Sequence, residues 1–539
     1  MSSPHVPHRK SWAIYAAVIA ILFLALSAGS AHALRPWIDE AWHGAPAWSL
    51  AFRGYMGTPS FVEPELKDID RYTYWIMPIY PVIQAGWYRL FSFSLASMRA
   101  LSVLCGLMGL LAWTFAFRRL TDDDVGALLF MALMACDYIN QSDVGVGRPD
   151  VMAFAFQAGA FATYLHWREK NLTLAILISQ TLVVCSGLTH PNGGMLSFIG
   201  ALWMVLYFDR RRIRTVHFLV ATIPYAAGAI GWGAYIAQNP SAFISQYGYQ
   251  LTTRSQILTA PWLAVRDELV NRYLTNMGLR FHSPNSYGPH YLKAVIFIAY
   301  AVAIVAILAA PALRRTNASG FLLGLIGIYF LFYTFLEGTK ASYYFIYLVY
   351  PYTAALVVFV RWCWKHSVPL RPLLAIGLAG LFFIQLGGVM YRIRRDPYHH
   401  EYMPAVDFLM AHAKPGDLIM GSQELGFTIG FRDNFVDDHL LGLQTGKRAD
   451  YILVEEIYQG RFDTVHLKNP AQYARLQKRL REYRVIYDKK NYQVLELRPE
   501  FKQSSQDHPQ ALATLRTKYF SSRPGSAPMR FNKNGSWSS

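Results

Sequence analysis

The sequence predicts an all-α polytopic membrane domain followed by a small α/β domain at the C-terminal end. Of the 539 residues, 53% are hydrophobic and only 16% are charged, whereas about 25% of the residues of an average soluble domain are charged. The apolar residues gather into runs, several of them near the ~20 residues that a helix needs to cross the hydrocarbon core of a bilayer. Beyond about residue 391 the composition becomes that of a soluble protein.

The apolar runs predict about eleven membrane-spanning helices. The first run resembles a signal peptide, because Arg9 and Lys10 precede it and Ala31-His32-Ala33 at its end is similar to a cleavage site. Its apolar stretch is longer than a usual signal core, so we expect a retained span. The expected spans are residues 12–33, 97–117, 125–140, 150–167, 172–189, 194–208, 215–236, 291–313, 319–336, 343–362 and 370–390.

Basic residues between these runs predict how the chain crosses the membrane. With the N-terminus in the cytoplasm, every cytoplasmic connection carries at least a basic pair, as the positive-inside rule requires. The net charge of +17 is therefore a topology signal, and no nucleic-acid motif accompanies it. We do not expect nucleic acid as a partner. The cytoplasmic basic residues are Arg118, Arg119, Arg168, Lys170, Arg210, Arg211, Arg212, Arg214, Arg314, Arg315, Arg361 and Lys365.

Three longer segments then fall on the outer side of the membrane. The first is the loop 34–96 within the transmembrane domain 1–390, and the second is the loop 237–290. The third contains an α/β domain over residues 391–500. Residues 501–539 are rich in Ser, Pro, Gly, Asn and Gln, which predicts a disordered tail. In the α/β domain we expect strands near 417–421, 451–455, 484–488 and 492–497 and helices near 402–413 and 470–482.

Two cations in short outer loops break the charge bias of this topology. Arg148 and Lys340 both lie at the outer ends of apolar spans, where a charge is costly and therefore informative. One interpretation is an ordinary ion pair, of Arg148 with Asp143 or Asp150 and of Lys340 with Glu337. The other is that they hold an anionic head group, because Arg offers phosphate a planar fork and Lys a point charge. Both interpretations stay open.

Adjacent carboxylates open the first outer loop directly after the first span. Asp39 and Glu40 lie between Trp37 and Trp42. A structural interpretation makes Asp39 a helix N-cap with Glu40 in the first turn. The chemical interpretation is glycosyl transfer. A lipid-phosphate leaving group departs with the help of cations alone, whereas the acceptor hydroxyl needs a base when it attacks. The sequence supplies carboxylates and cations on the same side of the membrane.

The ordered set of outer-loop motifs resembles the GT-C glycosyltransferases, in particular the protein O-mannosyltransferase and lipid A aminoarabinose transferase group. The Asp39-Glu40 pair after the first span is similar to the signature of that group. The resemblance covers about residues 10–390. The other matching segments are Tyr74-Trp75-Ile76-Met77-Pro78, Met98-Arg99-Ala100-Leu101, Arg148-Pro149-Asp150, Thr189-His190-Pro191-Asn192-Gly193-Gly194 and Lys340-Ala341-Ser342-Tyr343-Tyr344.

This resemblance implies a GT-C-like fold and a glycosyltransferase that moves a sugar from a polyprenyl-phosphate donor to a protein, lipid or glycan acceptor, usually with inversion of the anomeric centre. It implies that Asp39 is the catalytic carboxylate that activates or orients the acceptor and that Glu40 supports it. Lys340 and Tyr343 would lie near the donor phosphate, together with Arg148.

The resemblance further implies that Asp150 lines the same cavity as Arg148. The chain departs from the family pattern before Tyr74, where close relatives often carry a Lys-Pro-Pro-like stretch and this chain reads Asp70-Arg71-Tyr72-Thr73. Phosphate binding from this loop is therefore in doubt, with Arg71 or Lys67 as substitutes or as solvated loop charges.

Aromatic residues and two histidines complete the predicted site. Tyr74, Trp75, Tyr343 and Tyr344 stack on sugar rings, line the prenyl groove or act as interfacial anchors. His43 and His190 line the cavity, either as hydrogen-bonded loop residues or as metal ligands with Asp39 or Asp150. No close spacing of His, Cys and Asp supports a metal. We predict no certain cofactor, with a divalent metal as the open alternative.

A transporter or flippase of a lipid-linked sugar is the rival interpretation. Such a protein is expected to place ionisable residues along a path near the middle of the bilayer, whereas here the acids gather at the outer edge. A non-catalytic assembly scaffold leaves Asp39, Arg148 and Lys340 unexplained. The sequence thus favours chemistry in the cell envelope by a multi-pass protein of the bacterial inner (plasma) membrane, with the C-terminal domain outside.

Overall fold

The computed structural model of the chain describes residues 9–63, 65–254, 261–275, 290–338, 340–443, 445–502, 530–531 and 537–538. These residues belong to two compact units. The first contains Met1–Pro404 and Gln423–Asp433, and the second contains Ala405–Ser422 and Asn434–Ser539.

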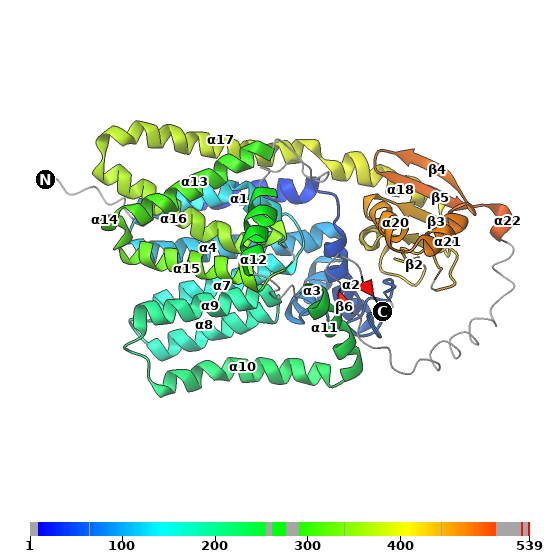
Figure 1. Cartoon of the computed structure of the whole chain (residues 1–539), viewed down its shortest axis with the longest axis horizontal. Helices are drawn as coiled ribbons and strands as arrows, with labels where there is room; N and C mark the ends of the chain where they lie inside the picture. The colour runs from blue at the N-terminus through cyan, green and yellow to red at the C-terminus, as the bar shows by residue number, and fades with distance from the viewer. Residues whose placement is uncertain are drawn as a thin grey trace. The chain divides into compact units, whose positions relative to one another are not determined.

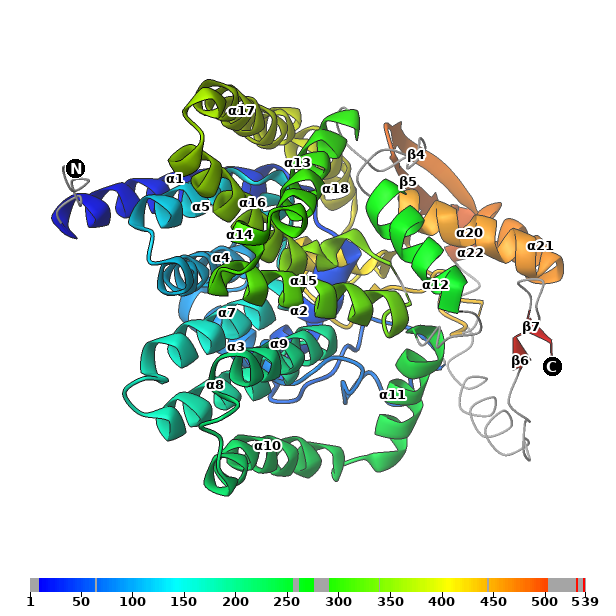
Figure 2. The ribbon, with the colours of Figure 1, turned by 60° about the vertical axis from the view of Figure 1, so that its left-hand side comes forward.

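Long helices that run side by side make up most of the first unit (Figures 1 and 2). Helix α7 packs against α4, α8 and α9, and α16 packs against α5, α13 and α15. The long helices are α1 (Arg9–Ala33), α4 (Leu95–Thr121), α5 (Asp124–Cys136), α7 (Pro149–Trp167), α8 (Leu172–Gly187), α9 (Pro191–Asp209), α10 (Thr215–Ile236), α13 (His290–Ala309), α15 (Asn317–Phe335), α16 (Ile346–His366) and α17 (Arg371–Arg395).

Shorter elements connect these helices. Five of them, α2, α3, α11, α12 and η1, lie in the two long loops that were expected on the outer side. They are α2 (Ile38–Arg53), α3 (Ile79–Phe91), α6 (Tyr138–Val144), α11 (Pro240–Arg254), α12 (Pro261–Asp267), η1 (Glu268–Thr275), α14 (Pro311–Arg314), η2 (Ser342–Phe345), η3 (Val368–Leu370), η4 (Tyr398–Tyr402), η5 (Gln423–Leu425) and α19 (Gly426–Ile429).

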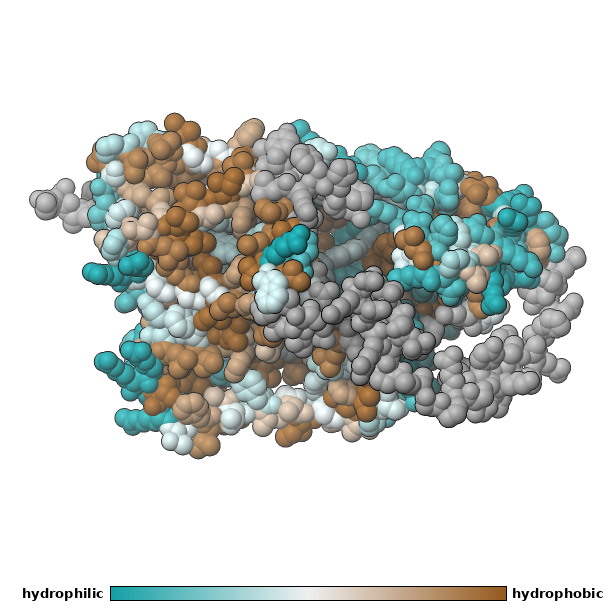
Figure 3. Space-filling model, viewed as in Figure 1, coloured by the Kyte–Doolittle hydropathy of each residue, from teal (hydrophilic) through white to brown (hydrophobic). Residues whose placement is uncertain are grey.

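The first unit is an integral membrane domain. Within the described ranges, seven helices are long and apolar enough to cross a membrane, or eight if the bent pair α5 and α6 forms one span. Their outer faces are apolar where a soluble protein would be polar, as the brown surface over α10 and α17 shows (Figure 3). Ile230 of α10 is 73% exposed and Phe383 of α17 is 80% exposed. A bilayer covers such faces with hydrocarbon.

Each of the eleven expected spans coincides with a helix, although their number as membrane crossings stays a prediction. The main difference concerns residues 125–140, which we expected to be one span. The chain bends there by 61° between α5 and α6. Asp137 lies at the break and accepts a hydrogen bond from the backbone N–H of Asn140 (2.8 Å), which caps the new helix. The last helix also runs further than residue 390, to Arg395.

Ion pairs join helix ends that were expected on the cytoplasmic side. Arg168 after α7 donates through Nε to Asp209 at the end of α9 (2.7 Å). Arg361 near the end of α16 donates through Nε to Asp123 just before α5 (2.7 Å). The helix ends that the positive-inside pattern assigns to one side therefore meet, and the starts of α7, α9 and α16 lie at the opposite end.

The two outer loops are hydrogen-bonded to each other through a buried glutamine of α11. Gln246 is fully buried, and its Oε1 accepts from the backbone N–H of Tyr74 (2.7 Å). Its Nε2 donates to the carbonyl groups of Lys67 (2.8 Å) and Tyr72 (2.9 Å). Backbone groups of an irregular loop lack the hydrogen-bond partners that a helix or a sheet would supply, and the Gln246 amide supplies them here. It thereby fixes α11 against the first loop.

The second unit is a small α/β domain built on a five-stranded sheet of order β2-β1-β3-β5-β4. Strands β1, β2 and β3 pair in parallel, and β5 pairs antiparallel with both β3 and β4. Its core contains Met420, Ile452, Leu476 and Leu495. The elements are α18 (Met403–His412), β1 (Ile419–Gly421), β2 (Phe435–Val436), β3 (Tyr451–Val454), α20 (Glu456–Lys468), α21 (Pro470–Leu480), β4 (Tyr483–Lys489), β5 (Tyr492–Leu497) and α22 (Pro499–Lys502).

The four expected strands and two expected helices of this domain are present. The sequence did not predict α20 or the two-residue strand β2. Most of the tail 501–539, which we predicted to be disordered, lies outside the described residues. Within the tail, β6 (Arg530–Phe531) pairs antiparallel with β7 (Trp537–Ser538).

Candidate functional site

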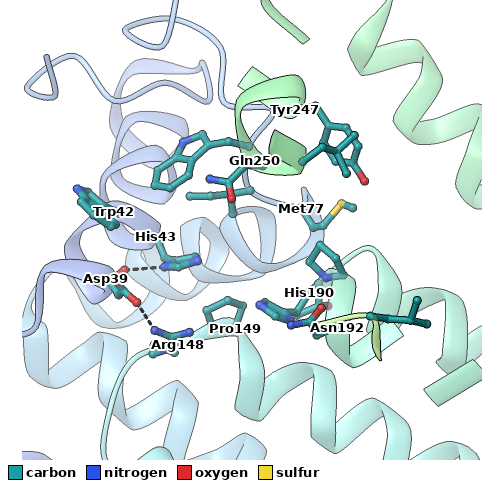
Figure 4. A pocket seen from close by; sticks show the side chains of 16 residues that line it. Asp39, Trp42, His43, Met77, Arg148, Pro149, His190, Asn192, Tyr247 and Gln250 are labelled. Atoms are coloured by element: carbon teal, nitrogen blue, oxygen red, sulfur yellow. Dashed lines mark hydrogen bonds and ion pairs between the residues drawn. The ribbon is translucent and has the colours of Figure 1, made fainter. Parts of the chain in front are cut away.

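A cavity of about 210 Å³ opens at the end of the first unit where the starts of α2, α7 and α9 meet. Helix α2 supplies Asp39, Trp42 and His43, and α11 of the second outer loop lies opposite with Tyr247 and Gln250. Figure 4 shows Arg148 and Pro149 between Asp39 and His190, with Tyr247 and Gln250 on the far side of the cavity. Segments far apart in the sequence thus contribute to one site.

Arg148 is the central charge of this site. The residue is 5% exposed and precedes α7 as its N-cap. Its Nη1 donates to Asp39 Oδ2, and its Nε donates to Asp150 Oδ2 at 2.8 Å. The guanidinium also lies over the rings of Trp37 (4.7 Å) and Tyr343 (3.7 Å). The expected pairing with Asp150 is present, and the pairing with Asp39 joins the acid of the first outer loop to the cation of the short connection between α6 and α7.

The fold of α2 brings Asp39 to this position. The helix begins at Ile38 with Trp37 as N-cap, so Asp39 is not the cap itself and lies in the first turn. The positive end of the helix dipole stabilises a carboxylate there. The Asp39 side chain is 19% exposed and lines the cavity, so a carboxylate oxygen remains within reach of a ligand.

Glu40, next in sequence, has a different environment and holds the site together. It is fully buried, and its two oxygens accept from Arg99 Nε (2.8 Å) and Arg99 Nη2 (2.6 Å). They also accept from the backbone N–H groups of Gly147 (2.7 Å) and Trp37 (2.9 Å). Glu40 therefore fixes the start of α2 to the loop that carries Arg148, and it does not line the cavity.

Arg99 is a residue of the site whose role the sequence analysis missed. It is 1% exposed, and besides Glu40 it donates to the carbonyl groups of Ala31 (2.6 Å), Leu34 (2.6 Å) and Arg35 (2.9 Å). It thereby ends α1 and turns the chain toward Asp39. A signal was present, because Arg99 is another cation at the outer start of a span, against the positive-inside bias.

His43 lies one turn after Asp39 and lines the cavity. Its Nδ1 donates to the backbone carbonyl of Asp39, so the neutral ring presents an unprotonated Nε2 toward the cavity (Figure 4). Burial, and secondarily the Arg148 guanidinium, lowers the pKa of His43 to about 3. The ring is therefore an uncharged hydrogen-bond acceptor at neutral pH.

His190 lines the other side of the cavity. Asp150, which the resemblance placed in the cavity lining, contacts His190 and is not among the residues that line the cavity. His190 is the N-cap of α9, and its Nδ1 accepts from the backbone N–H of Gly193 (3.4 Å). Nε2 then carries the proton and lies 3.5 Å from Asp150 Oδ1. Asp150 is 2% exposed and accepts from Arg148 on its other oxygen. It orients Arg148 and His190 from beneath the cavity.

The four predicted aromatic residues separate into three positions. Trp75 lines the cavity. Tyr343 faces the Arg148 guanidinium, and Tyr344 contacts the ring of His190 with centroids 5.6 Å apart. Tyr74 is 1% exposed and donates through its hydroxyl to the carbonyl of Tyr235 (3.1 Å), so it joins the two outer loops.

Lys340 occupies a second ion cluster, which we call the Arg272 cluster and which contains Glu268, Arg272, Glu337 and Lys340. The Lys340 ammonium donates to the carbonyl groups of Tyr333 (2.5 Å) and Glu337 (2.6 Å) and lies 3.1 Å from Glu268 Oε2. Lys340 thus caps the end of α15. It is not among the residues that line the cavity, and its predicted phosphate role stays a prediction.

The described residues contain no group of three or more His, Cys, Asp or Glu side chains arranged to hold a metal ion. In the cavity, His43, His190 and Asp39 are oriented by Arg148 and by backbone groups. This arrangement is suited to holding an anion and a hydroxyl group side by side.

Comparison with known proteins decides the fold. No protein-family model matches the chain, and no curated protein matches it in sequence. The crystal structure of ArnT from Cupriavidus metallidurans bound to undecaprenyl phosphate matches with a TM-score of 0.57 at 14% identity, over 90% of this chain and 98% of that chain. This chain has a GT-C-type glycosyltransferase fold. The expected fold class is confirmed.

Archaeal structures share this GT-C fold. The Archaeoglobus fulgidus oligosaccharyltransferase in the apo form matches with a TM-score of 0.56 at 10% identity, over 95% of this chain and 83% of that chain. AglB from Archaeoglobus fulgidus, in complex with an inhibitory peptide and a dolichol-phosphate, matches with a TM-score of 0.50 at 11% identity, over 92% of this chain and 75% of that chain.

Proposed function

We propose that this chain is a membrane glycosyltransferase that moves a sugar from a polyprenyl-phosphate donor to a protein, lipid or glycan acceptor. The observation that carries the proposal is the Asp39–Arg148 pair in the wall of a cavity at the end of a membrane-helix bundle. Two structures of the same fold support the donor class, because ArnT is bound to undecaprenyl phosphate and AglB is in complex with a dolichol-phosphate.

The pair suits a displacement at the anomeric carbon. The acceptor oxygen bonds to that carbon while the bond from the carbon to the phosphate oxygen breaks, and the electron pair leaves with the polyprenyl phosphate. Asp39 accepts or orients the proton of the acceptor hydroxyl, and Arg148 stabilises the charge that grows on the phosphate. A single displacement of this kind inverts the anomeric centre.

The surrounding residues hold this pair in place. Glu40 and Arg99 fix the start of α2, and Asp150 orients Arg148 from below. Tyr343, whose ring lies 3.7 Å from the Arg148 guanidinium, is the second group that we place next to the phosphate. Charges that are already in position stabilise the charge of the transition state, because the protein does not have to rearrange during the reaction.

We place the reaction at the non-cytoplasmic face of the inner (plasma) membrane of a bacterium, with the C-terminal domain on the same side. The basic residues at the opposite helix ends support this orientation through the positive-inside rule. Asp39 and the cavity lie at the other ends of these helices, where the short connections carry few cations.

Transfer by Asp39→Asn protein tests the proposal. Purified protein in proteoliposomes receives a radiolabelled undecaprenyl-phosphate sugar on both sides of the membrane and an envelope extract as acceptor. We expect wild-type protein to consume the donor and Asp39→Asn to lower the rate by about 10²–10⁴-fold, because the amide cannot accept a proton.

Asp70→Asn is the matched control, since Asp70 is an exposed acid of the same loop and should leave the rate unchanged. Near-normal turnover by Asp39→Asn would remove that carboxylate from the mechanism. A flippase would leave the donor chemically intact in every sample.

A further inference from the structure

The side of the cavity away from Arg148 contains aromatic and amide side chains beside aliphatic ones. Trp42 of α2 and Trp75 of the first loop form one wall, and Tyr247 and Gln250 of α11 face the same space. Asn192, at the start of α9, lies at the edge (Figure 4). We call these five residues the aromatic wall.

The aromatic wall is held rigidly by residues behind it. The rings of Trp42 and Trp75 pack edge to face with centroids 5.6 Å apart, and both contact Phe61. Gln246 ties α11 to the first loop with three hydrogen bonds, one residue before Tyr247. A wall that is ordered before a ligand arrives loses little entropy on binding it.

The charges of the cavity all lie on the other side. Arg148 pairs with both Asp39 and Asp150, and His43 is uncharged because burial lowers its pKa to about 3. His190 is directed toward Asp150. The aromatic wall therefore presents no charged group to the ammonium of an amino sugar or to the carboxylate of an acidic sugar.

An uncharged sugar fits these surfaces. A pyranose offers an apolar face to an indole ring and hydroxyl groups to the amides of Gln250 and Asn192. The size points in the same direction, since about 210 Å³ is below the ~300–1,000 Å³ of pockets that enclose drug-sized ligands. One sugar unit fills such a space.

We propose that the aromatic wall is the sugar subsite and that it selects a donor carrying a single uncharged monosaccharide, in preference to an amino sugar or an oligosaccharide. This inference rests on the proposed function, because it assigns the sugar of the same polyprenyl-phosphate donor. The phosphate then lies toward Arg148, and the anomeric carbon lies between the wall and Asp39.

Binding to the full-length protein in nanodiscs tests the inference. The probes are undecaprenyl phosphate alone, its esters with glucose, galactose and mannose, the ester with glucosamine, and an ester with a trisaccharide. We expect the best neutral hexose ester to bind roughly ten-fold more tightly than undecaprenyl phosphate, the factor that one or two well-made hydrogen bonds supply. The glucosamine and trisaccharide esters should bind no more tightly than undecaprenyl phosphate.

Variants of the aromatic wall test which residues cause the higher affinity for the hexose ester. Tyr247→Ala and Gln250→Ala should abolish the preference for the hexose ester and leave the affinity for undecaprenyl phosphate unchanged. Ile244→Ala, on the exposed side of α11, is the matched control and should keep the preference. Trp42→Phe keeps an aromatic ring and should reduce the preference only in part.

The outcomes separate this inference from the proposed function. Undecaprenyl phosphate that binds without any hexose preference, or a preference for the glucosamine or trisaccharide ester, overturns the sugar assignment and leaves the donor class standing. A hexose preference that survives in Tyr247→Ala and Gln250→Ala also overturns it. Failure of every undecaprenyl-phosphate probe to bind overturns both.

Discussion

Two ion clusters of nearly the same composition lie among the described residues of the first unit, and one of them borders the described cavity. Arg148 lies between Asp39 and Asp150 over the ring of Tyr343. Arg272 lies between Glu268 and Glu337 over the ring of Tyr333, 4.3 Å from its centroid.

The clusters differ in what else surrounds them. Arg272 and Glu268 are fully buried, and Lys340 beside them is bonded to helix carbonyl groups. Asp39 and Arg148 instead line the cavity, and the carboxylate of Asp39 is partly exposed. The comparison teaches that a membrane-edge cation is no sign of a site by itself, because protein groups can use all of its hydrogen-bonding capacity. Arg148 and Asp39 adjoin the described cavity, whereas Arg272 bonds Glu268, Glu337 and the Ala341 carbonyl.

The largest expected effect is on stability and concerns Arg272. Arg272→Met removes the guanidinium that bonds the two buried carboxylates of Glu268 and Glu337, and breaking a buried pair costs about 3–5 kcal/mol. We expect a much lower melting temperature in detergent and a normal rate for each folded molecule. Restoration of much of the melting temperature in the triple variant Arg272→Met, Glu268→Gln, Glu337→Gln would confirm the electrostatic cause. A folded Arg272→Met protein without activity would contradict the distinction between the clusters.

Arg148→Lys should have the next largest effect, and it concerns catalysis. Lysine keeps the positive charge but lacks the planar guanidinium that bonds Asp39 and Asp150 simultaneously. The loss of one donor that stabilises transition-state charge lowers kcat by about 10²–10³-fold. Steady-state kinetics with the polyprenyl-phosphate donor measures this loss, and Arg71→Lys in the first loop is the control. A rate within a factor of about two of wild type would place the phosphate elsewhere.

Lys340→Ala distinguishes the two interpretations of Lys340. Because its ammonium caps the carbonyl groups at the end of α15, we expect a stability loss of about 1–2 kcal/mol and an unchanged KM for the donor. A raised donor KM in stable protein would instead support the phosphate role that the sequence suggested. Lys340→Met, which keeps the side-chain length, controls for lost packing.

The smallest expected effect is a pH dependence due to His43. Its pKa is about 3 in the folded protein and 6.5 ordinarily, so the unfolded chain binds more protons between these values. Folding stability therefore falls as the pH drops from about 6.5 toward 3. We expect the melting temperature to fall less between pH 7.5 and pH 5 in His43→Gln than in wild type. The exposed His466→Gln is the control, and equal pH slopes in all three proteins would refute a buried neutral ring.

The sequence predicted the fold better than the functional geometry. Apolar runs and basic pairs depend on local chemistry, so the helices α1, α4, α9 and α10 follow from composition alone. The bend at Asp137 was missed because its cause is a capping contact made by one acid within a mostly apolar run. Helix α20 was missed because its residues show no clear apolar periodicity along the chain.

At the site, the sequence identified residue types and could not identify their neighbours. Asp39 and Arg148 are 109 positions apart, and nothing in their spacing shows that they pair. Glu40 and Asp39 are adjacent acids, yet one is fully buried against Arg99 and the other lines the cavity. Likewise Tyr247 and Gln250 belong to a loop helix whose position depends on the buried Gln246. These relations are long-range packing, which a single sequence does not encode locally.

The position of the donor phosphate tests the central claim most directly. A cryo-electron microscopy structure of the full-length protein in nanodiscs with undecaprenyl phosphate would show it. We predict that the phosphate lies within hydrogen-bonding distance of the Arg148 guanidinium, in the cavity that Asp39 lines. A phosphate bound instead at Lys340 and Arg272, with the Arg148 cavity empty, would contradict the account.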